Sequence, residues 1–261
     1  MSVSPRVIVT GAASGLGRAV CMAFAADGAW VLAVDRNRDM LEETCLLAAS
    51  APGEICAMAC DLLEGDCGQR VVDACVALGG RLDHLINNVG QGGSPPLHLT
   101  PDDRLAYFLE VNFMVAFRLC RAAIPIMRRA GGGTIVNIAS GVALRGSVPG
   151  NTAYVAAKSA VIGMSRQMAA EYGRDGIRVN VVAPGIVPTP ANAERIAGGA
   201  FQGDIDAIPL GHVGRPEDVA NAVVFLAGPK SAFITGEVLA VDGGWSATKY
   251  NVNTHPPYRD A

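Results

Sequence analysis

The sequence predicts an α/β protein with a doubly wound parallel sheet of about seven strands and helices on both faces. Short apolar, β-branched runs alternate with helical patterns along the whole chain, which is the order expected for a parallel sheet. The composition is 50% hydrophobic and 17% charged with 31 glycines, as suits buried strands and argues against disorder. At 261 residues the chain is long enough for one large domain, so residues 1–261 are expected to form a single unit.

Charge and hydropathy exclude several functions. The net charge is −3 and the longest basic cluster is Arg128-Arg129, so we expect no binding to nucleic acid or to an anionic membrane. The amino terminus lacks the pattern of a signal peptide, and no apolar run approaches the ~20 residues of a membrane span. The seven cysteines show no Cys-x-x-Cys pair and no histidine at metal-ligand spacing. The pattern predicts a cytoplasmic protein with reduced thiols and no metal site.

A glycine-rich turn follows the first predicted strand, residues 6–10, and precedes a helix over residues 18–27. Its glycines are Gly11, Gly15 and Gly17, in the spacing G-x-x-x-G-x-G. A turn of this kind presents backbone N–H groups and a helix amino terminus to a phosphate, and glycine permits the close approach. The turn is therefore expected to hold the pyrophosphate of a dinucleotide.

The second predicted strand, residues 30–34, ends at Asp35, eighteen residues beyond Gly17. An acidic residue at this place accepts hydrogen bonds from the hydroxyls of an adenosine ribose and repels a 2′-phosphate. The cofactor is thus expected to be NAD, with NADP as the less favoured choice. Arg36 and Arg38 leave NADP open, because their side chains could turn towards a 2′-phosphate.

A helix over residues 40–49 and a third strand over residues 54–60 lead to Asp61 and Leu62. These two residues stand where the end of a strand meets an adenine. The alternative for Asp61 is that it caps the helix that begins after Gly65.

The fourth predicted strand, residues 82–86, runs into Asn87-Asn88-Val89-Gly90. Asparagines at the end of a strand satisfy loose backbone groups or hold a neighbouring strand, so a structural role is expected for them first. The loop over residues 91–99, with two glycines and two prolines, is a candidate wall of the site.

A long helical region over residues 102–130 is expected to break near Pro125. It carries Asn112 on an otherwise apolar face, where a polar side chain must be hydrogen-bonded, so Asn112 is a candidate for a structural or relay role. A fifth strand over residues 133–138 leads to Ser140. Ligands of open α/β sheets bind beyond the carboxyl ends of the strands, and Ser140 lies on that edge.

Tyr154 and Lys158 are four residues apart in a predicted helix over residues 152–172, so both side chains can point into one site. A nearby ammonium favours a phenolate and lowers the pKa of the tyrosine, which would make Tyr154 a general acid or base. Taken alone, the pair favours an amphipathic helix with a packed tyrosine and a lysine that extends to water. The position of Ser140, Asp35 and the glycine turn on the same edge reverses that preference.

The remaining chain adds strands over residues 178–183 and 237–241 and a helix over residues 216–226. Residues 186–212 lack strong periodicity and contain several prolines and glycines, as expected of a lid beside a site. Residues 246–261 are expected to form an extended carboxy-terminal tail.

A set of motifs runs through the chain in a fixed order: Thr10-Gly-x-x-x-Gly-x-Gly17, Asn87-Asn88-x-Gly90, Asn112, Ser140, Tyr154-x-x-x-Lys158, Pro184-Gly185 with Thr189, and Asp242-Gly243-Gly244. Together they resemble the short-chain dehydrogenase/reductase family over essentially the whole chain, and this implies a Rossmann-type fold. Val89 departs from the resemblance, because the family usually has alanine there.

The resemblance implies hydride transfer between a nicotinamide and a carbonyl or secondary alcohol. Ser140 would hold the substrate oxygen and Tyr154 would exchange its proton, while Lys158 would bind the nicotinamide ribose and lower the pKa of Tyr154. Asn112 would support a water chain to solvent. The cofactor-binding residues would be Gly11, Ser14, Gly15, Leu16, Gly17, Asp35, Asp61, Leu62, Asn88, Gly90, Tyr154, Lys158, Pro184, Gly185, Ile186 and Thr189.

Three functions remain in view. The favoured one is an NAD-dependent dehydrogenase of a secondary alcohol or diol. A neutral small-molecule substrate is expected because the segments predicted to face the substrate, residues 91–99, 141–150 and 186–212, carry few charges. The second is an NADPH-dependent reductase of 3-oxoacyl groups on a carrier protein, with Arg128, Arg129 and Arg174 as a docking strip for an acidic partner. The third is a cofactor-binding sensor without catalysis, against which the complete set of catalytic residues argues. The family resemblance also implies a homotetramer.

Overall fold

A single sheet of seven parallel strands forms the centre of the protein, in the order β3-β2-β1-β4-β5-β6-β7. The computed structural model describes residues 4–146 and 150–248. The strands are β1 Arg6–Thr10, β2 Trp30–Asp35, β3 Glu54–Ala59, β4 His84–Asn87, β5 Gly133–Ile138, β6 Ile177–Pro184 and β7 Val238–Val241. Because the strand order reverses between β1 and β4, the sheet has a switch point there, and the predicted fold class is confirmed.

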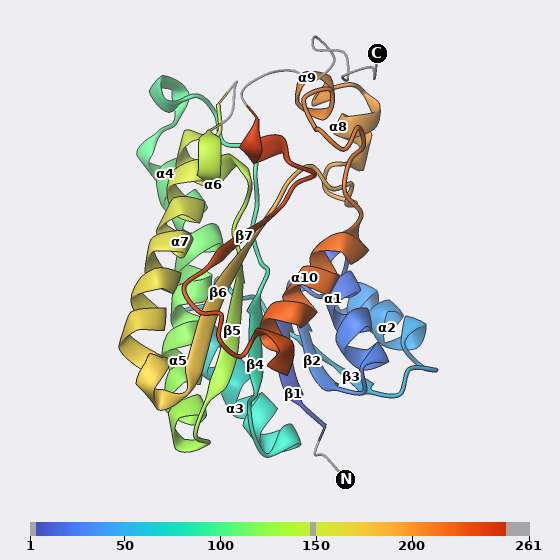
Figure 1. Ribbon diagram of the computed structural model, residues 1–261, viewed down its shortest axis with the longest axis vertical. Coiled ribbons are helices and arrows are strands. Elements are labelled where there is room, and N and C mark those ends of the chain that lie inside the picture. The colour runs from blue at the N-terminus through green and yellow to red at the C-terminus, as the bar shows by residue number, and fades with distance from the viewer. Residues whose placement is uncertain (1–3, 147–149, 249–261) are drawn as a thin grey trace, which may run out of the picture.

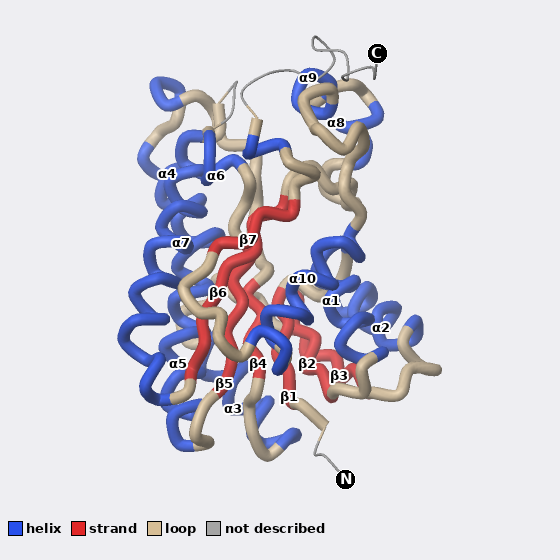
Figure 2. The backbone as a smooth tube through the Cα atoms, in the orientation of Figure 1, coloured by secondary structure: helices blue, strands red, loops and turns tan. Residues whose placement is uncertain are grey.

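Helices cover both faces of the sheet, as Figures 1 and 2 show. They are α1 Gly15–Ala26, α2 Arg38–Leu47, α3 Cys67–Gly79, α4 Asp102–Leu109, α5 Val115–Arg129, α6 Val142–Arg145, α7 Thr152–Tyr172, α8 Ala193–Ala197, α9 Gln202–Ile205 and α10 Pro216–Ala227. Five short segments of 3-10 or π helix accompany them in the described chain.

The core consists of one main apolar cluster on each face of the sheet. Strand side chains alternate between the two clusters, because successive residues of a strand point to opposite faces. Ile8 packs with α3 and α5 on one face, and Val7 and Val9 pack with α1 and α10 on the other. Burial of both faces explains why β1 and β2 are mostly apolar, whereas the edge strand β3 is partly exposed.

The predicted break near Pro125 is wrong. Helix α5 runs through Pro125, which is exposed, so the carbonyl group that the missing N–H leaves unpaired lies on the solvent side. The irregular part comes earlier, where residues Glu110–Met114 form a short π-helix between α4 and α5. The long helical region is therefore interrupted at Asn112 and not at the proline.

Some predicted bounds shift by a few residues, and three short helices had no prediction. Helix α1 starts at Gly15 and not at Arg18, and β4 begins at His84 and not at Leu82. Helix α6 and the two short helices α8 and α9 lie in segments for which no helix was predicted. Elements of four or five residues are too short to show helical periodicity.

All seven cysteines are free, and five of them are buried. In the described residues, no helix is both long and apolar enough to cross a membrane. Within residues 4–146 and 150–248 there is also no group of three histidine, cysteine or acidic side chains that could hold a metal ion. The predicted tail begins in the described chain, but its residues 249–261 lie outside it.

Candidate active site

The candidate site lies at the edge of the sheet where the parallel strands end. In Figure 1 this edge faces α6, α8 and α9, whereas the chain enters the sheet at the opposite edge. The glycine turn follows β1, Asp35 ends β2, Asn88 follows β4, and Ser140 follows β5. The fold thus brings together residues that are more than a hundred positions apart in the sequence.

The glycine turn is built for close approach of a ligand to backbone. A Cβ on Gly17 would lie 1.9 Å from the carbonyl oxygen of Gly11, so only glycine fits there. Gly11 and Gly15 have φ values of 66° and 53°, which side chains rarely adopt. Helix α1 begins at Gly15, so the first-turn N–H groups of Gly15, Leu16 and Gly17 have no intrahelical acceptor. This arrangement fits a pyrophosphate.

Thr189 closes the turn from the opposite side. Its Cγ2 lies 3.1 Å from the position that a Cβ on Gly15 would take. The Thr189 hydroxyl and N–H both donate to Oδ1 of Asn192, which fixes the segment after β6. Residue 189 therefore lies beside the glycine turn.

Asp35 is tied to the same turn. Its Oδ2 accepts a hydrogen bond from the N–H of Ala13 at 3.3 Å, and its Oδ1 accepts one from the N–H of Asn37 at 3.1 Å. The carboxylate is partly buried, whereas Arg36 and Arg38 are exposed. Two backbone N–H groups thus hold the Asp35 carboxylate beside the glycine turn.

Asn87 and Asn88 hold neighbouring strands, as expected of asparagines at this place. The Asn88 amide donates to the carbonyl oxygens of Thr10 and Gly11 at 3.0 and 3.2 Å, which joins the end of β4 to the glycine turn. The Asn87 amide donates to Asn137 in β5 at 2.7 Å. Both contacts support the floor of the candidate site.

Asp61 does not cap the next helix. Its Oδ1 accepts from the N–H of Leu63 at 3.0 Å and closes a local turn, while Asp66 is the residue that precedes α3. Leu62 is buried. The N–H of Cys60 donates to the carbonyl of Asp35 at 2.8 Å, so Asp61 and Leu62 follow directly from a residue that is anchored to the end of β2.

Lys158 and Asn112 converge on Gly90. A Cβ on Gly90 would lie 2.8 Å from both the Nζ of Lys158 and the Oδ1 of Asn112, so a side chain is excluded there. Lys158 is 3% exposed and donates to the carbonyl oxygen of Ile138 at 2.9 Å. Burial lowers the pKa of Lys158 from 10.5 to about 8.

Asn112 is fully engaged with backbone. Its Nδ2 donates to the carbonyl oxygens of Phe108 and Gln91 at 3.0 and 3.1 Å, and its Oδ1 accepts from the N–H of Gln91 at 2.9 Å. The side chain is 2% exposed, so these bonds replace the water that it has lost. The π-helix around Asn112 thereby holds the start of the loop over residues 91–99.

Tyr154 is partly buried beside Ser140 and the same loop. A Cβ on Gly92 would lie 3.9 Å from Cζ of Tyr154, and the N–H of Tyr154 donates to the Ser94 hydroxyl at 3.3 Å. Burial raises the pKa of Tyr154 above its ordinary value, and a hydrogen bond with Ser140 acts in the opposite direction. The carboxyl edge therefore places a phenol, a hydroxyl and an ammonium around one point.

The expected lowering of the Tyr154 pKa by Lys158 does not arise from the groups of the chain alone. The Nζ of Lys158 lies 6.0 Å from the centre of the Tyr154 ring and is hydrogen-bonded to Ile138. Desolvation disfavours the phenolate and is the largest influence on the pKa of Tyr154, and the group that opposes it is Ser140 and not Lys158. Spacing along a helix predicts that two side chains meet but not how much water surrounds them.

Hydrogen bonds at the carboxyl ends of β6 and β7 support the site. The carbonyl oxygen of Pro184 accepts from the N–H of Gly141 at 2.8 Å, and the N–H of Gly185 donates to Val241 at 2.9 Å. The carbonyl oxygen of Ile186 accepts from Gly214 at 2.9 Å. The segment that starts with Ile186 is thus anchored at both of its ends.

Sequence reasoning missed two supporting residues. Asn151 precedes α7 with a φ of 72°, the only positive value outside glycine in the described residues, and its Oδ1 accepts from Gly93. Ser94 accepts from Tyr154 through its hydroxyl and from Asn151 through its carbonyl. The residue type was the available signal, because asparagine tolerates this conformation better than most residues.

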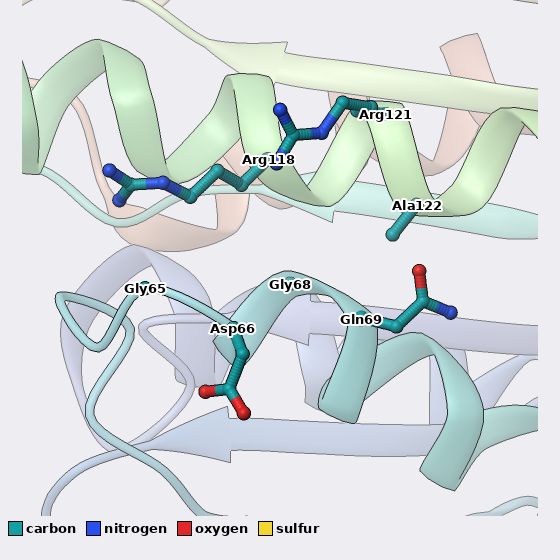
Figure 3. Close-up of a pocket in the computed structure, with 7 residues that line it drawn as sticks. All are labelled: Gly65, Asp66, Gly68, Gln69, Arg118, Arg121 and Ala122. Atoms are coloured by element: carbon teal, nitrogen blue, oxygen red, sulfur yellow. The ribbon is translucent and has the colours of Figure 1, made fainter.

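Two surface hollows lie away from these residues. One, of about 80 Å³, lies between the start of α3 and the middle of α5, and Figure 3 shows Arg118 and Arg121 opposite Asp66 and Gln69 there. The other, of about 540 Å³, lies beside Gly133, Ile177 and Phe233, where β5 and β6 begin. None of the residues lining either hollow is a predicted site residue.

Comparison with known proteins identifies the class. Residues 11–246 match the family model described as Enoyl-(Acyl carrier protein) reductase. The 3-oxoacyl-[acyl-carrier-protein] reductase FabG of Thermotoga maritima is 36% identical over 91% of this chain and 96% of its own length. The D-threitol dehydrogenase of Mycolicibacterium smegmatis is also 36% identical, over 92% of each chain.

A solved structure agrees with these relatives. A 7α-hydroxysteroid dehydrogenase, complexed with NADH and 7-oxo glycochenodeoxycholic acid, superimposes with a TM-score of 0.88 at 31% identity, over 93% of this chain and 94% of that one. The chain belongs to the short-chain dehydrogenase/reductase family, and its relatives are oxidoreductases that act on alcohols and ketones.

Proposed function

We propose that the protein is an NAD-dependent dehydrogenase that interconverts a secondary alcohol or diol and its ketone. The observation that carries the proposal is the meeting of Tyr154, Ser140 and Lys158 at the carboxyl edge, with Asp35 beside the glycine turn on the same edge. A phenol that is hydrogen-bonded to a hydroxyl suits proton exchange with an alcohol oxygen. Asp35 favours NAD.

In the proposed reaction, the alcohol oxygen binds between Ser140 and Tyr154. In ketone reduction the phenol of Tyr154 gives its proton to the carbonyl oxygen while hydride adds to the carbonyl carbon. In alcohol oxidation the phenolate of Tyr154 takes that proton, and the hydrogen on carbon leaves as hydride with its electron pair, so that a ketone forms. NAD supplies the hydride acceptor when it is bound. Ser140 stabilises the negative charge that develops on the oxygen, and the ammonium of Lys158 adds a positive charge nearby.

The residues present fit such a cofactor. The glycine turn, with Gly11, Ser14, Gly15, Leu16 and Gly17, would hold the pyrophosphate, and Asp35 the adenosine ribose. Asp61 and Leu62 would border the adenine. Further contacts are proposed for Asn88, Gly90, Lys158, Pro184, Gly185, Ile186 and Thr189.

Asn112 is proposed to act by positioning. Because it fixes the backbone of Gln91 on both its N–H and its carbonyl, it sets the loop that borders Tyr154. It also lies next to Lys158 across Gly90, where polar atoms could lead a proton from the site towards solvent.

Segment 186–212 is proposed to serve as the substrate lid of a single domain. Its short helices α8 and α9 stand over the carboxyl edge (Figure 1). The few charges of this segment support a neutral substrate. The proposed assembly is a homotetramer, which the family resemblance implies. The proposed location is the cytoplasm, which the pattern of cysteines favours.

Reduction of 3-oxoacyl groups on a carrier protein is the second candidate, favoured by the similarity to FabG of Thermotoga maritima. The arrangement of the basic residues argues against it. Arg128 and Arg129 end α5 and Arg174 precedes β6, so all three lie at the edge where strands begin, and Arg128 is paired with Asp175. An acyl carrier docked there would lie at the edge where the strands begin, whereas Tyr154 lies at the edge where they end.

A substrate panel distinguishes these functions. Secondary alcohols, cis- and trans-diols and 3-oxo esters are assayed with NAD(H) and NADP(H) by nicotinamide absorbance. The proposal expects turnover of an alcohol or diol with NAD. Turnover restricted to 3-oxo esters with NADPH would favour the second candidate, and cofactor binding without turnover of any compound would favour a sensor.

A further inference from the structure

Arg145 joins two segments that are a hundred residues apart. It ends α6, five residues after Ser140, and its guanidinium carbon lies 4.4 Å from the ring centre of Trp245, which follows β7. Its Nη1 donates to the carbonyl oxygens of Trp245 and Thr248. The guanidinium of Arg145 thus contacts residues 245–248 in two ways: it lies over the face of the Trp245 ring, and it donates to two backbone oxygens.

Trp245 packs against the loop that carries Ser140 and Gly141, which is called the Ser140 loop below. The ring is 6% exposed, and its Cε3 and Cζ3 atoms lie 3.6 Å from the position of a Cβ on Gly141, the residue after Ser140. Within the described residues, the indole N–H has no hydrogen-bond acceptor. The ring is therefore held by packing and by Arg145, without a hydrogen bond of its own.

The turn before Trp245 supports the end of the segment proposed as a lid. A Cβ on Gly243 would lie 2.7 Å from Cγ2 of Ile208, and one on Gly244 would lie 3.0 Å from Cγ of Pro209. The N–H of Leu210 also donates to the carbonyl of Gly243 at 3.2 Å. The same turn touches Gly185, so the segment over residues 242–245 contacts both ends of the lid and the back of the Ser140 loop.

We infer that Arg145 is a positioning residue that, through Trp245, holds the Ser140 loop and the end of the lid in the relative placement needed to bind the alcohol. The inference rests on the proposed dehydrogenase function. Arg145 is exposed and Ser140 contacts Tyr154 independently of it, so loss of Arg145 leaves the proton-transfer groups in place. The glycine turn follows β1 and Asp35 ends β2, so the contacts proposed there for the pyrophosphate and the adenosine ribose lie on elements that Arg145 does not touch, and a much smaller effect on NAD than on the alcohol is expected.

Steady-state kinetics of Arg145→Met test the inference. The KM for the alcohol is expected to rise about tenfold, while the KM for NAD changes by less than about twofold. Arg145→Lys retains the charge over the ring and is expected to recover most of the loss. A matched control is Arg6→Met, because Arg6 lies 5.3 Å from the ring of Trp30, the other tryptophan, on the far edge of the sheet. Arg6→Met is expected to leave the KM for the alcohol unchanged.

Fluorescence provides a readout that does not require turnover. In a Trp30→Phe background, Trp245 is the remaining tryptophan, and its quenching by acrylamide is expected to increase at least about twofold in Arg145→Met, since the ring loses its main restraint. Unchanged quenching together with an unchanged KM for the alcohol would overturn the inference. Equal rises in both KM values would overturn it too, because they would indicate general loosening.

Failure of the proposed function has a different signature. If the wild-type protein turned over no alcohol with NAD, the dehydrogenase would be wrong, and quenching alone would decide whether Arg145 fixes Trp245. If Arg145→Met does not fold, Arg145→Lys carries the test. In that case Arg145→Lys is compared with Arg145→Gln, which lacks the positive charge. If the two variants have equal KM values for the alcohol and equal quenching, the inference is overturned, because the charge then has no effect.

Discussion

The ammonium of Lys158 donates a hydrogen bond to the carbonyl oxygen of Ile138 at 2.9 Å, two residues before Ser140. This contact links α7, which carries Tyr154, to the end of β5, which carries Ser140. Lys158 is buried at this contact, and because burial disfavours its charged form, its pKa is lowered. The arrangement of the candidate site therefore has consequences for stability as well as for catalysis.

Lys158→Met is expected to be more stable than the wild type at pH 7. With a folded pKa of about 8 against an unfolded value near 10.5, the folded state binds fewer protons between these values, so stability rises with pH through this window. Below pH 8 the buried charge lowers the stability of the wild type by about 3 kcal/mol. Lys158→Met avoids this cost but loses about 1 kcal/mol with the hydrogen bond to Ile138. Urea unfolding should show that the difference in unfolding free energy between the variant and the wild type is smaller at pH 10.5 than at pH 7. The variant is also expected to lose turnover. A variant that is less stable at pH 7 would refute this reading.

Gly90→Ala is expected to lower kcat about a hundredfold, because its Cβ would displace Lys158 or Asn112 and small misplacements of catalytic groups are costly. The matched control is Gly163→Ala in α7, where nothing lies within 4 Å of the new Cβ. That control should keep full activity and gain about 0.5 to 1 kcal/mol in stability. Equal activities for the two variants would mean that the contact at Gly90 does not matter.

Asp35→Ala is expected to reduce the preference for NAD over NADP at least about tenfold, since a repulsive charge opposite the 2′-phosphate is removed. The ratio of kcat/KM values for the two cofactors is the measurement. Asp39→Ala, in the exposed first turn of α2, serves as the control and should leave the ratio unchanged. An unaltered preference in Asp35→Ala would show that another residue selects the cofactor.

His84 predicts a loss of stability in acid. Its ring stacks on Phe24 at 5.9 Å, its Nδ1 is buried without a partner in the described chain, and burial lowers its pKa to about 4. The unfolded state binds the proton first, so stability falls as the pH drops from about 6.5 to about 4, by up to about 3 kcal/mol from this group. Relative to the wild type, His84→Phe should gain that amount across the same window. Parallel pH profiles of the two proteins would count against the assignment.

Much of this site could be predicted from the sequence, because it depends on local patterns. The four-residue spacing of Tyr154 and Lys158, the glycine turn and the polar residues after apolar strands are each visible within a short stretch. The contacts between distant segments could not be predicted in this way. Examples are Arg145 on Trp245 and Lys158 on Ile138, which exist only once the sheet has brought the segments together.

The remaining errors have physical causes of the same kind. The long helical region was expected to break near Pro125, but α5 continues through this exposed residue, where the carbonyl group that lacks a donor faces solvent. The pKa of Tyr154 was expected to fall, whereas burial raises it. Both expectations failed because degree of burial is a property of the folded chain and not of spacing along it.

Tyr154→Phe tests the central claim most directly. Binding of NAD and turnover of the best alcohol are measured for this variant and for Tyr172→Phe, a control at the far end of the same helix. Loss of the phenolic hydroxyl is expected to reduce turnover about a thousandfold or more and to leave NAD affinity within about twofold, since the hydroxyl acts in proton transfer. Turnover equal to that of Tyr172→Phe would contradict the account, because the proton would then pass through another group.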